Sequence, residues 1–217
     1  MKLTREVPLN IEQASLLFID VQNFSAHRMG AEFRELDPDE FDEKYGWYFL
    51  ELENRVIPNM QALLSASRNV GMEVIHTTIE SLTQDGRDRS LDYKITGFHV
   101  PKGSWDGKVI DELQPVGDEI WLPKTSSSVF ISTHIDYLLR NLGVRQIVIS
   151  GLITDQCVES AIRDACDLGY LITQVTDACL TYSQERHDHS LQTIKGYCRQ
   201  VTTAELLAEI NAASVPT

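Results

Sequence analysis

One cysteine of this chain stands where a thiol can act as a nucleophile. Cys157 follows a short β-branched run at 146–149, which is typical of a buried parallel strand. An apolar helical period follows it, formed by Val158, Ala161, Ile162, Ala165 and Leu168. We expect Thr154 or Asp155 to cap that helix. The helix dipole and the free N–H groups of the first turn would then favour the thiolate, which is the nucleophilic form.

Two charged residues could complete this chemistry. Asp20 ends the apolar run 14–19, and Lys124 follows the run 118–123. The carboxyl ends of parallel strands share one edge of a sheet, so both side chains can converge on Cys157. Lys124 would stabilise a carboxylate and a thiolate, Asp20 would carry the thiol proton to a leaving amine, and main-chain N–H groups would hold the oxyanion. Taken singly, Asp20 could equally be a helix cap, and Cys157 a small buried apolar residue.

Strands and helices alternate along the rest of the chain. Further strands are expected at 72–78, 170–177 and 199–202. Helices are expected from Val56 to near Gly71 and at 133–142, 158–168, 190–197 and 203–211. A polar loop is expected between Thr181 and His189. The pattern predicts one domain, 1–217, of the α/β class: a three-layer sandwich whose six-stranded, mainly parallel sheet of Rossmann type is flanked by helices.

Charge and hydropathy limit the classes of partner. The net charge is 19 − 32 = −13, which argues against nucleic acid and anionic membranes. No apolar run approaches the ~20 residues of a membrane span, and the N-terminus shows no apolar region of a signal peptide. We therefore expect a cytoplasmic protein that binds a small molecule.

Two segments between these elements suggest contacts with a ligand or a partner. Residues 32–53 hold nine acids interleaved with aromatic residues, which indicates a helix whose one side packs as a pocket cap or against another subunit. Residues 81–106 show no clear period, and long irregular connections are often functional. The candidates for a pocket lining there are Glu80, Arg87, Arg89 and Trp105.

The other cysteines give little support to disulfide, zinc or redox chemistry. No CxxC pair occurs among Cys157, Cys166, Cys179 and Cys198. Cys157 and Cys166 share a helix but are ~13 Å apart along its axis, beyond the ~7 Å that a disulfide spans between Cα atoms. We interpret Cys166, Cys179 and Cys198 as core or loop thiols.

Several motifs in this order resemble the isochorismatase-like cysteine hydrolases. The similar pieces are the segment 16–24 around Asp20, Lys124 with Ser128 and Phe130, Gly151-x-x-Thr154-Asp-x-Cys157-Val, and Asp177-Ala178. The resemblance spans residues 12–204. It implies a six-stranded parallel sheet, a homodimer or homotetramer, and a catalytic triad of Asp20, Lys124 and Cys157. It also implies a cis peptide at Leu152–Ile153 and an oxyanion hole formed by the N–H groups of Ile153 and Cys157.

The resemblance also narrows the activity. Isochorismate-cleaving members lack the cysteine that this chain has, and residues 77–81 show no histidine pair like that of the nicotinamidase metal site. The segment 102–106 resembles members that hydrolyse ureido and carbamoyl amides, such as the ureidoacrylate amidohydrolases. This implies a metal-independent, cofactor-free cysteine amidohydrolase that cleaves the C–N bond of a small linear amide, ureide or N-carbamoyl compound through a thioester.

Two other classes of function stay open at this point. A member of the fold could bind without turnover, or Cys157 could be a thiol redox sensor. If the chain is a hydrolase, we expect its substrate pocket to be lined by Phe24, Glu80, Arg87, Trp105, Phe130 and Tyr182.

Overall fold

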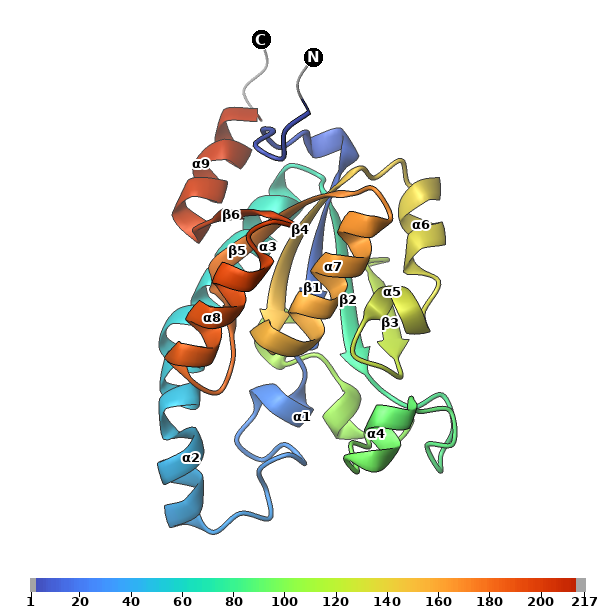
Figure 1. The fold of residues 1–217 in the computed structure, drawn as a ribbon, viewed down its shortest axis with the longest axis vertical. Coiled ribbons are helices and arrows are strands. Elements are labelled where there is room, and N and C mark those ends of the chain that lie inside the picture. The colour runs from blue at the N-terminus through green and yellow to red at the C-terminus, as the bar shows by residue number, and fades with distance from the viewer. Residues whose placement is uncertain (1–2, 214–217) are drawn as a thin grey trace.

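A computed structural model of the chain describes residues 3–213, and it shows a six-stranded sheet with helices on both faces (Figure 1). The strands are β1 (Ala14–Ile19), β2 (Glu73–Ile79), β3 (Ile120–Lys124), β4 (Gln146–Leu152), β5 (Leu171–Leu180) and β6 (Arg199–Val201). Their order is β3-β2-β1-β4-β5-β6, and every neighbouring pair is parallel. The predicted fold class is confirmed. The direction of winding reverses between β1 and β4, where such sheets bind ligands.

Both faces of the sheet are buried, which explains why its inner strands are almost continuously apolar. Leu16 and Phe18 of β1 point into one core, and Leu17 and Ile19 point into the other. The first core packs against α2 (Pro38–Glu51), α3 (Ile57–Asn69) and α9 (Thr203–Ala213). The second packs against α5 (Val129–Ser132), α6 (Ile135–Asn141), α7 (Glu159–Asp167) and α8 (Gln184–Ile194).

Shorter helical segments complete the architecture. They are η1 (Ile11–Gln13), α1 (Asn23–Ala26), η2 (Leu52–Val56), α4 (Leu91–Ile95), η3 (Trp105–Gly107), η4 (Asp111–Leu113) and η5 (Thr154–Val158). The strands point toward the end of the molecule that carries α1 and α4, opposite to α9 (Figure 1). The candidate catalytic residues therefore lie at the α1 and α4 end. Across residues 3–213, no helix is both long and apolar enough to cross a bilayer.

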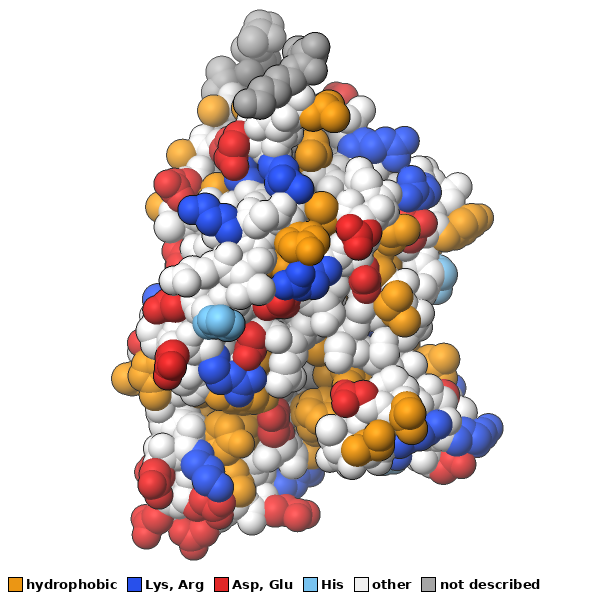
Figure 2. Space-filling view, viewed as in Figure 1, with side chains coloured by type: hydrophobic (Ala, Val, Ile, Leu, Met, Phe, Trp, Pro, Cys, Tyr) orange, Lys and Arg blue, Asp and Glu red, His pale blue; other side chains and the backbone are white. Residues whose placement is uncertain are grey.

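The acidic segment 32–53 contains the whole of α2. Asp37 caps this helix by accepting from the N–H of Asp39, and Pro38 begins it. The aromatic side chains pack inside the chain: the Phe33 ring lies 4.9 Å from Tyr45 and 5.1 Å from Phe49. The acidic side chains gather on the surface at the end of the molecule where α2 begins (Figure 2). Part of the aromatic face of this segment thus packs into the core of the same chain.

Two predicted boundaries are wrong. Helix α8 begins at Gln184, within the expected loop, because Ser183 caps it by accepting from the N–H of Arg186. Strand β5 continues to Leu180 instead of ending at Asp177. The Asp177 carboxylate accepts from both the N–H and the hydroxyl of Thr203 at 2.7 Å, so it caps α9 and does not end the strand.

Candidate active site

Three side chains converge at the carboxyl edge of the sheet. Asp20 directly follows β1, Lys124 is the last residue of β3, and Cys157 lies in η5 after β4. The Lys124 Nζ is 2.8 Å from Asp20 Oδ2 and donates to Cys157 Sγ at 3.3 Å. The three residues are 2%, 0% and 6% exposed, respectively. The buried Lys124 ammonium thus contacts both of the other candidates from the sequence, Asp20 and Cys157.

A glycine allows strand β4 to approach β1 closely at this point. The register pairs Ile19 with Gly151 of β4 and with Thr77 of β2. Gly151 has a φ of +148°, and a Cβ there would lie 2.3 Å from the Ile19 carbonyl oxygen. Only glycine fits such an approach. The close contact sets the spacing between Asp20 and the turn that carries Cys157.

Asp20 has an unusual backbone conformation that its neighbours hold in place. Its φ of +54° is left-handed, which is uncommon for a residue other than glycine. Its N–H donates to the Thr77 carbonyl at 3.0 Å, and the Thr77 hydroxyl donates to Asp20 Oδ1 at 3.3 Å. Left-handed residues of this kind are concentrated at functional sites. The contacts fix the carboxylate beside Lys124.

Burial dominates the ionisation of all three groups. Burial raises the pKa of the Asp20 carboxyl, although Lys124 opposes the shift. Burial alone would lower the pKa of Lys124, but the Asp20 carboxylate and the Cys157 sulfur outweigh it and raise that pKa. Burial raises the pKa of the Cys157 thiol to about 12, against the pull of Lys124. The Lys124 ammonium is thus the group that opposes the effect of burial at both Asp20 and Cys157.

One expectation about the Cys157 turn is wrong, and burial acts against another. Burial of the sulfur raises its pKa, which opposes the thiolate that the helix start was expected to favour. Neither Thr154 nor Asp155 caps the helix; the N-cap position is Ile153, without a side-chain cap. The Thr154 hydroxyl instead pairs with His187 Nδ1 at 3.0 Å, and the Asp155 carboxylate accepts from Arg186 at 2.7 Å. Both side chains tie the turn to α8.

The peptide bond between Leu152 and Ile153 is cis, as the family resemblance implied. It lies between the end of β4 and the turn that carries Cys157. Assignment of the Ile153 and Cys157 N–H groups to an oxyanion hole stays a prediction.

An aromatic wall connects one predicted pocket residue to the sulfur. The Phe24 ring meets the edge of Phe98 at 4.7 Å, and Phe98 lies 5.1 Å from the ring of Tyr93. The Tyr93 hydroxyl is 3.8 Å from Cys157 Sγ. Phe24 thus belongs to the same apolar cluster as Cys157.

Three other predicted pocket residues have identifiable partners elsewhere. Glu80 is buried, and its Oε1 accepts from the Gly103 N–H at 2.6 Å, which holds the loop after β2. Phe130 packs against Tyr170 at 6.1 Å. Tyr182 donates its hydroxyl to Glu32. These contacts explain the positions of the three side chains without a ligand.

The remaining predicted pocket residues are more exposed. Trp105 is 44% exposed and meets the edge of the His27 ring at 4.9 Å. Arg87 is exposed, and its guanidinium pairs with Asp85 at 3.0 Å. Arg89 donates to the Gly86 and Phe98 carbonyls at 2.9 and 2.8 Å, so it closes the loop around α4. Both arginines thus have partners within the segment 85–98, and a role of either in the pocket stays a prediction.

Tyr93 is the residue at the site that sequence reasoning missed. It lies in α4, a five-residue helix within the stretch that shows no period. The Ser90 N–H donates to the Thr125 carbonyl at 2.9 Å, which anchors α4 beside the residue after Lys124. No local signal reveals a contact between segments this far apart in the chain.

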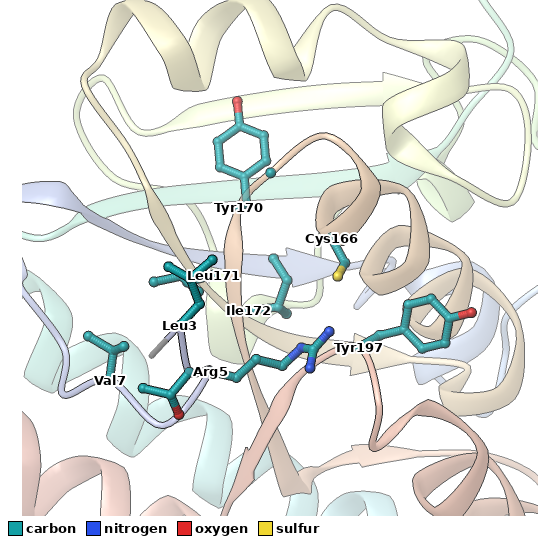
Figure 3. Close-up of a pocket in the computed structure, with 10 residues that line it drawn as sticks. Leu3, Arg5, Val7, Cys166, Tyr170, Leu171, Ile172 and Tyr197 are labelled. Atoms are coloured by element: carbon teal, nitrogen blue, oxygen red, sulfur yellow. The ribbon is translucent and has the colours of Figure 1, made fainter. Parts of the chain in front are cut away.

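The other features that suggest chemistry lie away from this site. Cys166 lines a separate cavity of about 580 Å³ with Arg5 and Tyr197 (Figure 3). That cavity is at the opposite end of α7 from Cys157. Among residues 3–213, no group of three or more His, Cys, Asp or Glu side chains is arranged to hold a metal ion.

Comparison with known proteins identifies the family. The family model of the isochorismatase domain matches residues 14–206. The chain belongs to the isochorismatase family. The ureidoacrylate amidohydrolase RutB from Rhizobium rhizogenes is 30% identical over 175 residues, which cover 68% of this chain and 71% of that enzyme. The protein is thus an isochorismatase-like hydrolase.

Solved structures support the same fold. A cysteine hydrolase from Pseudomonas syringae pv. phaseolicola superposes with a TM-score of 0.81 at 24% identity, covering 98% of this chain and 99% of the other. An N-carbamoylsarcosine amidase from Thermoplasma acidophilum superposes with a TM-score of 0.66 at 23% identity, covering 88% and 96%. At these identities the likeness concerns the fold.

Proposed function

We propose that this isochorismatase-family protein is a cysteine amidohydrolase. Its substrate would be a small linear amide, ureide or N-carbamoyl compound, cleaved at the C–N bond without a metal or other cofactor. The carrying observation is the buried Lys124 ammonium, 2.8 Å from the Asp20 carboxylate and 3.3 Å from the Cys157 thiol. Two similar proteins are named as an amidohydrolase of ureidoacrylate and an amidase of N-carbamoylsarcosine, which supports the substrate class.

The first step is a proton transfer that keeps the buried charges paired. Asp20 takes the proton of Cys157 Sγ, so the negative charge moves from the carboxylate to the sulfur. Lys124 contacts both groups, so its counter-ion is the Asp20 carboxylate before the transfer and the Cys157 thiolate after it. No uncompensated charge is left in the interior, which would be strongly unfavourable. This exchange makes a thiol with a pKa of about 12 usable as a nucleophile.

The bond-making steps follow from this arrangement. The sulfur attacks the carbonyl carbon, and the Ile153 and Cys157 N–H groups stabilise the oxyanion. Asp20 returns the proton to the leaving nitrogen, the C–N bond breaks, and ammonia or an amine departs. A water molecule, deprotonated by Asp20, then attacks the thioester carbonyl. The C–S bond breaks, the acid is released, and the sulfur regains its proton.

The test is a release assay for ammonia and amines across ureides, N-carbamoyl amino acids and simple amides. We expect the wild type to turn over at least one of them and Cys157→Ala to turn over none. Protein quenched during turnover should carry the acyl group on Cys157 by peptide mass spectrometry. Binding without turnover would instead favour a catalytically silent member of the fold. Rapid peroxide oxidation of Cys157 with no hydrolysis would favour a redox sensor.

A further inference from the structure

A second hydrogen-bond donor faces the nucleophile. We propose that Tyr93 is a further catalytic residue, whose hydroxyl donates to the Cys157 sulfur when that sulfur is a thiolate. The inference rests on the proposed function, because it assigns a role at the same site. The hydroxyl oxygen is 3.8 Å from Cys157 Sγ and 3.5 Å from Lys124 Nζ. Thiolate contacts are long because sulfur is large, and catalytic hydrogen bonds tighten once substrate is bound.

The two contacts of Tyr93 define the direction of its hydroxyl hydrogen. An ammonium group can only donate, so the Tyr93 oxygen accepts from Lys124. The O–H hydrogen is then available for the sulfur. Tyr93 is buried, and burial raises the pKa of its phenol above the ordinary value. The group stays protonated, so it acts as a donor and not as a base.

The sulfur needs this donor because the Lys124 ammonium also donates hydrogen bonds to other groups. The ammonium lies 2.8 Å from Asp20 Oδ2, donates to the Ser126 carbonyl at 2.8 Å, and donates to Cys157 Sγ at 3.3 Å. With the Tyr93 oxygen at 3.5 Å, its three hydrogens therefore serve four acceptors. The contact to the sulfur is longer than those to Asp20 and Ser126. A buried anion with one long hydrogen bond is poorly solvated, and Tyr93 supplies a second.

The chain places Tyr93 by specific contacts on both sides. The Ser90 N–H donates to the Thr125 carbonyl at 2.9 Å, next to Lys124. The Ser90 hydroxyl then caps α4 by accepting from the N–H of Tyr93 at 3.3 Å. The Tyr93 ring packs against Phe98 at 5.1 Å. The aromatic packing does not require a hydroxyl, so the hydroxyl can be removed without loss of the ring.

The experiment uses Tyr93→Phe, which keeps the ring and removes only the oxygen. The pH dependence of Cys157 alkylation by iodoacetamide, read by peptide mass spectrometry, reports thiolate formation without any substrate. We expect the alkylation curve to shift to higher pH and kcat to fall about 10- to 100-fold, with KM changed less than about twofold. The matched control is Tyr170→Phe, whose hydroxyl donates to Asp136 at 2.8 Å and should change neither readout.

Two outcomes would overturn the assignment. A Tyr93→Phe enzyme with wild-type alkylation and wild-type kcat would show that the hydroxyl does not stabilise the thiolate. A lower kcat with an unshifted alkylation curve would place its effect on the substrate and not on the thiolate. Because alkylation needs no amide, a failure of the proposed hydrolysis would leave this test intact.

Discussion

Replacing Lys124 with methionine should destabilise the fold through Asp20, and the loss should depend on pH. Asp20 is only 2% exposed, and its counter-charge is the Lys124 ammonium at 2.8 Å. Without that ammonium, a buried carboxylate has no compensating charge. Its least unfavourable response is to bind a proton.

The magnitude follows from the cost of that protonation. The ordinary pKa of the Asp20 carboxyl is 3.8, and each pH unit above it corresponds to ~1.4 kcal/mol. Protonation therefore costs about 4 kcal/mol at pH 7 and about 2 kcal/mol at pH 5. The value at pH 7 agrees with the ~3–5 kcal/mol lost when one partner of a buried ion pair is removed. In Lys124→Met the folded state keeps a proton that the unfolded state releases above pH ~4, so its stability falls as pH rises.

Urea unfolding of the wild type, Lys124→Met and Asp20→Asn/Lys124→Met at pH 5, 6 and 7 tests this reasoning. The free energy of unfolding that Lys124→Met loses relative to the wild type should grow by up to ~1.4 kcal/mol for each unit that the pH rises. The double variant carries no buried charge at these positions, so most of its stability should return at pH 7. Turnover should be lost by several orders of magnitude in both variants. The reasoning is refuted if the deficit is the same at pH 5 and pH 7, or if the double variant is as unstable as Lys124→Met.

Three further predictions concern pH and metal. First, kcat/KM should fall as pH falls through the pKa of Asp20, which burial raises, so a rate profile should have its acid limb above the ordinary value near 4. Second, burial raises the pKa of Glu32 to about 7 from an ordinary 4.5, so the wild type should lose stability as pH rises between those values. Urea unfolding at pH 8 should show Glu32→Gln, which keeps an acceptor for Tyr182, to be more stable by up to ~3 kcal/mol. Third, chelation should leave turnover unchanged; activity lost with EDTA and restored by zinc, iron or manganese would exclude the metal-free mechanism.

The residues at strand ends were accessible from the sequence because their signal is local. Asp20 and Lys124 stand at the ends of apolar runs, and Cys157 lies between such a run and a helical period. Parallel strands connected through helices place those ends on one edge, whatever the strand order. The distances among the three side chains depend on the order β3-β2-β1-β4 and on the close approach at Gly151, which local patterns do not contain.

The rest of the pocket depends on contacts between distant segments. Tyr93 reaches the sulfur because one hydrogen bond joins Ser90 to Thr125 across 35 positions of the chain. Arg87 was expected in the pocket because it lies in the stretch 81–106, which shows no period, but Asp85, two residues away, supplies a partner at the surface. The pKa of Cys157 likewise depends on more than the local sequence. Its place at a helix start is visible in the sequence, whereas its burial is a property of the whole fold.

Burial also separates the proposed hydrolase from the redox sensor. A sensing cysteine is an accessible thiol of low pKa, commonly with a second cysteine that resolves the oxidised form. Here burial raises the pKa of Cys157, Cys179 and Cys198 to about 12 in each case, and all four cysteines of the chain are free. A neutral, buried thiol reacts slowly with peroxide. In the proposed mechanism, the thiol becomes nucleophilic only when Asp20 removes its proton beside Lys124. Hydrolysis of a bound amide needs this step, and a redox sensor does not.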